Sequence, residues 1–381
     1  MPTPPVLDFD ALLAPISDDQ PTGVNLKTDP KSGELYHKIK READLSRTSE
    51  RLLRVAERNE DGSVKDKIDP PVWPSVVEQS IRVLTETSKD LWITAWLIEG
   101  LARQDGFAGL RDGFRLVREL SERYWEGLHP PLDEDDVAEG EYTATIQLSR
   151  LVGGETEGTL VGPILQIPIV SSSKHGEYSS ADYLLAEDLE QMTDPVARQN
   201  RIDAGAVTLA QFEPAADETP AEFYQNLLED VSECIDEYRK MGDLLVEKCV
   251  DADGNQLAPT VSQTERLLDE CRERIKYVSR NVLATDEEGA GEDAAACGAG
   301  AASGTVGNRE AAFRELLKIA DFFSRTEPHS PVSYALRQVV SWGRMSLPEL
   351  LAELIEEPGV RDTLFKRTGI PRPESNEPAS S

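Results

Sequence analysis

The sequence predicts an all-α protein made of antiparallel helical bundles, and three observations indicate this fold class. Apolar residues recur at three- and four-residue steps along most of the chain, a spacing that puts them on one face of a helix. Glycine and proline interrupt these runs at short intervals, where helices are expected to end. The stretch richest in strand-forming branched residues, 160–170, carries two prolines. We expect it to be an edge strand or an extended loop.

Three consecutive helices are predicted in the N-terminal region. Their apolar faces lie within residues 77–84, 91–101 and 110–124. Ser88 is the predicted N-cap of the second helix. The sequence His129-Pro130-Pro131 ends the third helix, because proline lacks a backbone N–H and disfavours the preceding helical turn. Short connections between helices favour antiparallel packing, so we expect residues 1–170 to form a helical N-terminal domain.

The middle region, residues 171–283, is predicted to contain a long helical hairpin. Apolar residues within 223–245 and again within 268–282 repeat about every 3.5 residues, as in coiled-coil packing. The short polar segment 251–256 joins the two runs. An antiparallel hairpin within one chain is the favoured arrangement. Pairing of the two seams between different chains stays open as an alternative.

The C-terminal part of the chain has a different composition. Residues 284–307 are Gly, Ala and acidic residues with one large aliphatic, a composition that cannot offset its ordering entropy and predicts a flexible linker. Residues 308–370 predict three helices in a small domain that is marginal alone, so we expect it to oligomerise. Residues 371–381 are predicted to be a disordered tail.

Four residues of this small domain are candidate oligomerisation residues. They are of the arginine and aromatic types enriched at interface hot spots: Tyr334, Arg337, Trp342 and Arg344. Core packing of the tryptophan and plain solvation of the two arginines are the alternatives.

Charge limits the classes of partner. The chain carries 40 Lys and Arg against 71 Asp and Glu, for a net charge of −31. Such a polyanion repels nucleic acid and anionic lipid, which argues against binding to either. The charge is unevenly distributed, because residues 308–381 have a net charge of only −1. Copies of the C-terminal domain could therefore associate without the repulsion that the acidic remainder would suffer.

Several features predict a cytoplasmic protein. The N-terminus lacks the basic start of a secretory signal. The longest nearly unbroken apolar stretch, 163–170, is far short of the roughly 20 residues that cross a membrane, so no membrane insertion is expected. The four cysteines form no C-x-x-C pair and are expected to be reduced. Cys234 and Cys271 lie on the hairpin seams and are predicted core residues rather than nucleophiles.

No catalytic pattern is found, so we expect no enzyme, no cofactor and no metal site. The sequence lacks H-E-x-x-H, zinc-ligand spacing, G-x-x-x-x-G-K-[ST] and G-x-S-x-G. Four adjacent carboxylates at 133–136 could attract a divalent cation. They lack the calcium-loop pattern, however, and a solvated loop or helix start is favoured. An enzyme that uses this acidic run with a divalent cation is the most distant alternative.

An ordered series of motifs carries a family resemblance. The motifs lie at 12–26 (LLAPISDDQPTGVNL), 89–101 (KDLWITAWLIEGL), 106–116 (GFAGLRDGFRL), 121–125 (SERYW) and 128–136 (LHPPLDEDD). Together they resemble the ImpA N-terminal domain of the TssA proteins of the bacterial type VI secretion system. The last two motifs supply the family-motif residues Trp125, His129, Pro130, Pro131 and Asp133. Residues 327–345 and 347–355 resemble the C-terminal end of the same family.

The resemblance implies a structural role. TssA-like proteins form ring-like or star-like oligomers through their C-terminal region. They act at the baseplate or sheath, where they prime or cap the polymerisation of tail tube and sheath. The implied partners are further copies of the chain and the sheath, tube and baseplate proteins, with the membrane complex in some cases. A helical adaptor or chaperone-like scaffold unrelated to secretion is the alternative.

Overall fold

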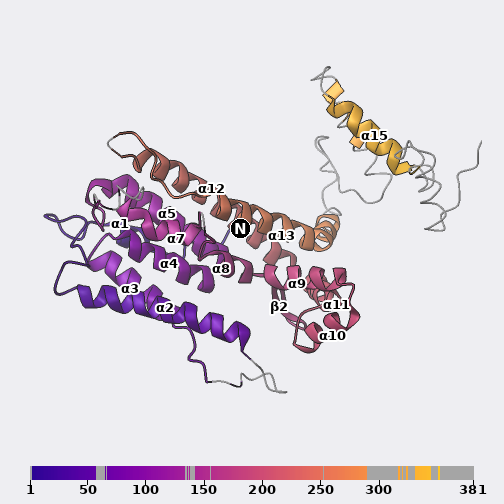
Figure 1. The fold of residues 1–381 in the computed structure, drawn as a ribbon, viewed down its shortest axis with the longest axis horizontal. Coiled ribbons are helices and arrows are strands. Elements are labelled where there is room, and N and C mark those ends of the chain that lie inside the picture. The colour runs from indigo at the N-terminus through magenta and orange to yellow at the C-terminus, as the bar shows by residue number, and fades with distance from the viewer. Residues whose placement is uncertain are drawn as a thin grey trace, which may run out of the picture. The chain divides into compact units, whose positions relative to one another are not determined.

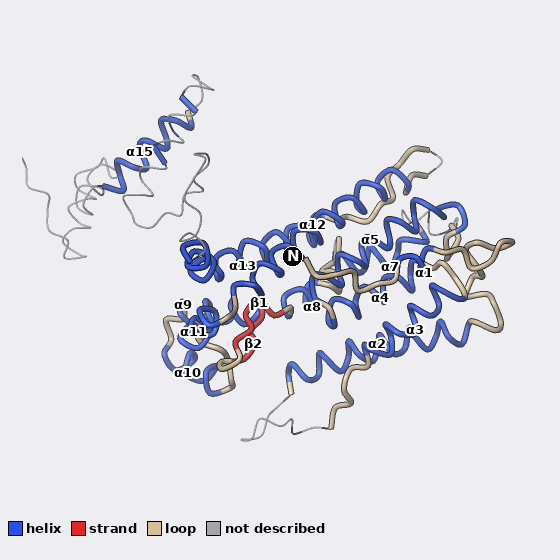
Figure 2. The backbone as a smooth tube through the Cα atoms, turned by 180° about the vertical axis from the view of Figure 1, so that it is seen from behind, coloured by secondary structure: helices blue, strands red, loops and turns tan. Residues whose placement is uncertain are grey.

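The structure, a computed structural model, describes residues 2–56, 65, 67–133, 135, 137, 142–154, 156–251, 253–289, 316, 317, 320, 323, 324, 331–344 and 351. Within this part of the chain the fold is mostly helical, as predicted (Figure 2). The chain divides into two compact units, residues 1–294 and 295–381.

The described helices of the first unit are drawn in chain order in Figure 1. They are α1 (Phe9–Leu13), α2 (Gly33–Val55), α3 (Trp73–Glu86), α4 (Leu91–Gln104), α5 (Gly106–Tyr124), α7 (Ile146–Val152), α8 (Val161–Gln166), α9 (Ser180–Gln191), α10 (Pro195–Asp203), α11 (Leu209–Glu218), α12 (Ala221–Lys248) and α13 (Ser262–Gly289). Two short 3-10 turns, η1 (Trp125–Gly127) and η2 (Thr143–Thr145), precede α7.

Helix α4 is the centre of the N-terminal bundle and packs against both α3 and α5. Eleven of its 14 residues are buried, as expected for a helix with neighbours on several sides. Two glycines let these helices approach closely. A Cβ at Gly100 would lie 2.4 Å from Val77 Cγ2, and a Cβ at Gly113 would lie 2.6 Å from Ile98 Cγ1. The three predicted helices are therefore present, and small residues set the distance between them.

The predicted cap of α4 was wrong. The N-cap is Asp90, whose side chain accepts hydrogen bonds from Trp92 N (2.8 Å) and Ile93 N (3.2 Å). Ser88 is buried, and its hydroxyl has no hydrogen-bond partner among the described residues. Its backbone instead pairs with Gly23. The chain between α3 and α4 thus adds a bridge that local capping rules do not anticipate.

Helices α12 and α13 lie side by side, joined by residues 249–261, so their apolar seams meet within one chain. Cys234 and Cys271 are fully buried in this region, which confirms them as core residues. In the connection, Asp251 Oδ1 accepts hydrogen bonds from Asp253 N (2.9 Å) and Asn255 N (2.7 Å). The carboxylate closes a hairpin turn.

Helix α12 also packs along α5, so the middle region shares a core with the N-terminal bundle. The rings of Phe114 and Tyr238 meet edge to face, with centroids 4.8 Å apart. The boundary expected at residue 170 falls inside this unit. The packing of α12 on α5 cannot be predicted from local sequence, because it joins helices about a hundred residues apart.

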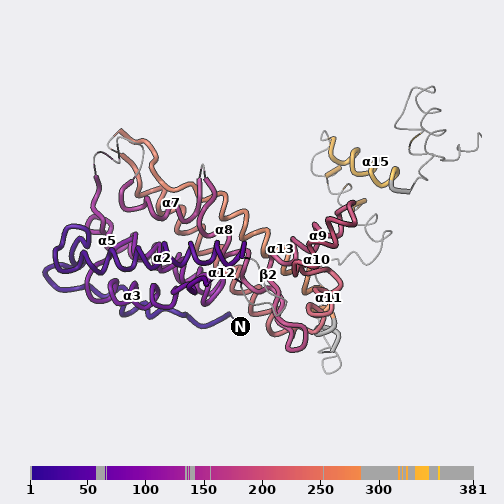
Figure 3. Tube along the Cα trace, turned by 60° about the horizontal axis from the view of Figure 1, so that its bottom comes forward, coloured from indigo at the N-terminus to yellow at the C-terminus, as the bar shows by residue number. Residues whose placement is uncertain are grey.

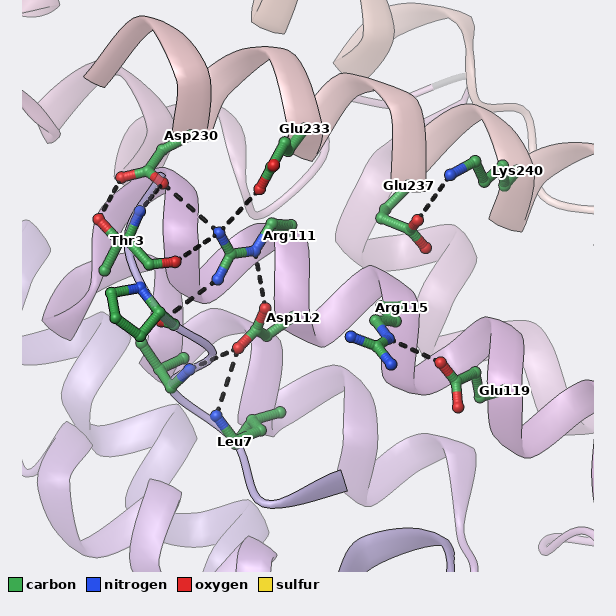
Figure 4. Close-up of polar contacts among 12 residues, drawn as sticks. Thr3, Leu7, Arg111, Asp112, Arg115, Glu119, Asp230, Glu233, Glu237 and Lys240 are labelled. Atoms are coloured by element: carbon green, nitrogen blue, oxygen red, sulfur yellow. Dashed lines mark hydrogen bonds and ion pairs between the residues drawn. The ribbon is translucent and has the colours of Figure 1, made fainter. Parts of the chain in front are cut away.

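A buried polar cluster ties the N-terminal segment across α5 and α12 (Figure 4). Arg111 on α5 donates to Thr3 O (2.9 Å), to Asp112 Oδ1 (2.8 Å) and to Glu233 Oε2 on α12 (3.0 Å). Thr3 N donates to Asp230 Oδ1 of α12 (2.8 Å). Because Arg111, Asp112 and Asp230 are all buried, the cluster fixes the N-terminal segment as part of the core.

The segment 160–170 differs in part from its prediction. Residues 161–166 form helix α8, and Pro163 lies in its first turn, where a missing N–H removes no intrahelical hydrogen bond. Pro168 begins strand β1 (Pro168–Ser172), which pairs antiparallel with β2 (Gly176–Ser179) in a two-stranded sheet. The register matches Val170 with Tyr178. The expected strand is present from Pro168 onward and is confirmed. The expectation was wrong for residues 161–166, which are helical and not extended.

The second unit is described by helix α15 (Val332–Arg344) and a few flanking positions. Most of the predicted linker, C-terminal domain and tail lies outside the described residues. At the start of the linker, α13 continues to Gly289, so residues 284–289 are helical.

Candidate functional site

The family-motif residues of the N-terminal region all follow the end of α5. Trp125 opens the η1 turn, and His129, Pro130, Pro131 and Asp133 lie on the loop after it. Pro130 is buried, whereas Pro131 and Asp133 are exposed. The structure therefore brings these residues together on one loop, and this loop meets two of the other motifs, 12–26 and 89–101.

The meeting point is a backbone junction. His129 N donates to Lys89 O (2.9 Å), and Leu91 N donates to His129 O (2.9 Å). Lys89 N donates to Thr22 O (2.8 Å). Gly23 has φ +73°, and a Cβ there would lie 2.0 Å from Thr87 O, so only glycine fits. We call residues 22–24, 87–91 and 129 the motif junction.

Lys89 supplies the central cation of the motif junction. Its side chain is fully buried, and Nζ donates to Leu12 O and to Leu84 O, each at 2.7 Å. These carbonyls belong to α1 and to the last turn of α3, where helices leave acceptors unpaired. Burial lowers the pKa of Lys89 to about 8. The ammonium joins α1 to the end of α3.

Asp90 and His129 are the other titratable groups of the junction. Burial raises the pKa of Asp90 to about 6, against the opposing effect of its hydrogen bonds from Ile93 and Trp92. Burial lowers the pKa of His129. His129 Nε2 lies 3.3 Å from Gly23 O, so a neutral ring carries its proton on Nε2. Its Nδ1 is buried and has no partner among the described residues.

Aromatic side chains follow Leu91 and precede His129 in the sequence, at Trp92 and Trp125. Trp125 stacks on Tyr142 with ring centroids 5.3 Å apart. Trp92 Nε1 donates to Thr143 O (2.8 Å), and the Lys27 ammonium lies 3.5 Å from the centroid of a Trp92 ring. Asp133 N donates to Thr143 Oγ1 (2.6 Å). The loop is thereby fastened to the η2 turn.

The contacts of the motif junction hold backbone segments in place. Lys89 and Asp90 bind backbone groups through their side chains, and His129 Nε2 faces a backbone carbonyl. This arrangement leaves no nucleophile beside a base, which is the pairing that covalent catalysis requires. Among the described residues there is no group of three or more His, Cys, Asp or Glu that could hold a metal ion. No described helix is long and apolar enough to cross a membrane.

Comparisons with known proteins agree with the motifs. Residues 13–150 match the family model described as ImpA, N-terminal, type VI secretion system. The type VI secretion system component TssA1 of Pseudomonas aeruginosa is 28% identical over 369 residues, which cover 92% of this chain and 96% of that protein. Both comparisons show that this chain is similar to TssA proteins. The matched range contains every residue of the motif junction.

A solved structure shares the fold of this chain. It is the N-terminal domain, including the ImpA_N region, of the TssA component of the type VI secretion system from Burkholderia cenocepacia. The match has a TM-score of 0.54 and 21% sequence identity, and it covers 74% of this chain and 98% of that one.

The C-terminal candidate residues all lie on α15. Tyr334 is 71% exposed and Arg337 is also exposed, whereas Trp342 is half-buried. Arg344 is the last residue of the helix. Tyr334 and Arg337 are three residues apart and share one helical face. Their role in assembly of a TssA-family oligomer stays a prediction.

Sequence reasoning missed the residues that organise the motif junction. Lys89, Asp90 and Gly23 lie inside the quoted motifs, yet none was singled out. Asp90 had a local signal, since an aspartate directly before an apolar helical run is a common N-cap. Lys89 had none, because a lysine at a helix start is ordinarily solvated.

Proposed function

We propose that this TssA-family chain is a structural assembly component of the type VI secretion system. It forms a ring-like homo-oligomer through residues 308–370 and acts at the baseplate or the sheath, where it primes or caps polymerisation of tail tube and sheath. The observation that carries the proposal is the match to TssA1 along 96% of that protein's length. The match extends beyond the N-terminal motif region.

The charge distribution supports assembly through the C-terminal unit. Residues 1–294 carry 30 Lys and Arg and 60 Asp and Glu, a net charge of −30, and several such units packed together would repel one another. The remaining residues are nearly neutral. On α15, Tyr334 projects a largely exposed ring, a residue type enriched at interface hot spots.

The proposed partners are further copies of the chain and the type VI sheath, tube and baseplate proteins, with the membrane complex as a further candidate. The site of action is the bacterial cytoplasm. The motif junction positions helices, so we infer that the protein performs no catalysis and uses no cofactor. In this account the N-terminal unit contacts partners while the C-terminal unit multiplies the copies.

The mass of the protein in solution tests the proposal. The full chain should form a defined oligomer by light scattering coupled to gel filtration, and residues 1–294 should not form that assembly. Trp342→Ala should lower the mass of the full chain. Trp92→Ala is the matched control, because it should lower the melting temperature through lost packing while the oligomer persists.

A monomeric full chain at high micromolar concentration would contradict the ring. A stable oligomer that binds neither sheath nor tube protein in a pull-down would instead support the adaptor alternative, as would a gene located away from sheath and baseplate genes.

A further inference from the structure

A groove separate from the motif junction lies between α9, α11 and α13, which are neighbours in Figure 1 and Figure 3. It consists of two adjoining hollows of about 810 Å³ and 330 Å³. Tyr183, Glu187 and Tyr277 line both hollows, so the two are continuous. Glu213 and Asp217 line the smaller hollow. We call these five residues the α9–α13 groove.

Two tyrosines form an aromatic wall in this groove. The rings of Tyr183 and Tyr277 have centroids 6.4 Å apart and are inclined by 59°. Tyr277 is 55% exposed, a large open surface for an aromatic ring. The Arg280 guanidinium lies 3.9 Å from the Tyr277 ring centroid, which shows that this ring accepts a cation on its face.

A carboxylate stands beside the aromatic wall. The Tyr183 hydroxyl donates to Glu187 Oε1 (3.0 Å), which orients the carboxylate and leaves its other oxygen available. Among the described residues no Lys or Arg makes an ion pair with Glu187, Glu213 or Asp217. Seven carboxylates and three arginines (Arg266, Arg274 and Arg280) line the two hollows, so the groove is net negative.

Carboxylates of α13 that line the larger hollow form ion pairs within the chain. Arg239 pairs with Glu265 (2.6 Å) and with Asp269 (3.1 Å). Lys276 pairs with Glu273 (2.8 Å). These pairs show that the helix compensates acidic residues where cations are within reach. The unpaired carboxylates of the groove, Glu187, Glu213 and Asp217, belong to α9 and α11.

The chemistry of the groove indicates which class of ligand it binds. An aromatic wall next to an unpaired carboxylate fits a long cationic side chain, whose apolar stem packs on the rings while its charged end meets the carboxylate. A second copy of this unit would approach against its own charge of −30. A basic protein segment is instead attracted by this negative charge. The volume suits a few side chains rather than a folded domain.

We propose that the α9–α13 groove binds a short segment of another protein that carries Lys or Arg, with one cationic side chain seated against Tyr183 and Tyr277 and paired with Glu187. The groove gives the N-terminal unit a partner site of its own. This proposal does not depend on ring formation, since every groove residue belongs to residues 1–294.

Fluorescence anisotropy with the full chain tests the proposal. The probe is a fluorescein-labelled peptide of Lys, Leu and Gly at physiological ionic strength, compared with the same peptide carrying Glu for Lys. Glu187→Gln should weaken binding about fivefold, the effect of losing one ion pair of about 1 kcal/mol. Tyr277→Leu should weaken it by a similar factor, while Tyr277→Phe, which keeps the ring, should stay within about twofold.

Glu78→Gln is the matched charge control, because it removes one negative charge from an exposed glutamate on α3, as Glu187→Gln does in the groove. It should change binding by less than about twofold. Equal losses in Glu78→Gln and Glu187→Gln would overturn the proposal in favour of general attraction to a polyanion. So would failure of the lysine peptide to bind the wild-type chain. A mass in light scattering that falls on Tyr277→Leu would overturn it in favour of a second copy.

Discussion

The motif junction and the α9–α13 groove use charged side chains in opposite ways. In the junction, the Lys89 and Asp90 side chains are buried and form hydrogen bonds with backbone groups of the same chain. In the groove, Glu187 and Asp217 line a hollow with Arg280, yet neither carboxylate forms an ion pair with a Lys or Arg among the described residues. The first arrangement builds the fold, and the second leaves charge for an outside molecule. Substitutions should separate the two, with stability affected at one site and binding at the other.

The largest effect is expected at Lys89. Lys89→Met keeps the length of the side chain but leaves the Leu12 and Leu84 carbonyls buried without a donor. We expect the free energy of unfolding to fall by about 3 kcal/mol, since each orphaned acceptor costs about 1–3 kcal/mol and relief of the buried charge offsets part of this loss. Urea denaturation followed by circular dichroism measures it.

Lys27→Met is the control for this change. It removes an exposed ammonium of the same type from above Trp92, which should cost less than about 1 kcal/mol. Similar losses in the two variants would show that burial of the Lys89 ammonium does not matter to the junction.

A smaller, pH-dependent effect is expected at Asp90. Asn can cap α4 as Asp does, so Asp90→Asn isolates titration. The pKa of Asp90 is about 6 in the folded state against 3.8 for the free side chain, so the folded state binds the proton more tightly. Relative to Asp90→Asn, the free energy of unfolding of the wild type should fall by about 2 kcal/mol as pH rises from 4 to 7.

His129 and Lys27 are present in both proteins of this comparison, so their titration cancels. The measurement is a pair of urea titrations at several pH values between these limits. A difference between the two proteins that does not change with pH would contradict a raised Asp90 pKa.

The smallest effect on stability is expected in the groove. Glu187→Gln and Tyr277→Leu should each change the free energy of unfolding by less than about 0.5 kcal/mol, as is usual for substitutions outside the core. Thermal unfolding at neutral pH measures it. A loss of 2 kcal/mol or more in Glu187→Gln would assign that carboxylate to the fold and remove the contrast with the junction.

Local patterns predicted the parts of the fold that local physics decides. Helices α3, α4, α5, α12 and α13 each repeat apolar residues on one face, and these were found from spacing alone. The α8 segment was missed because a proline in a first helical turn and a proline opening a strand look alike in sequence.

Contacts between distant segments were beyond the sequence. The shared core of α5 and α12 was missed, because no local signal links residues so far apart. For the motif junction, resemblance identified the loop with His129 but could not show that it pairs with Lys89 and Gly23. The groove was missed for the same reason, since Tyr183 and Tyr277 are neighbours only after folding.

The cluster of Arg111, Asp112 and Asp230 has a consequence for protein synthesis. The N-terminal segment and α5 leave the ribosome long before α12, which completes their packing. During translation the apolar side of α5 and the Arg111 guanidinium stay unpacked until α12, which begins at Ala221, has been synthesised. A nascent chain that ends before Ala221 exposes apolar surface that promotes aggregation. Chaperone binding to this protein should therefore rise and fall with the length of chain already made.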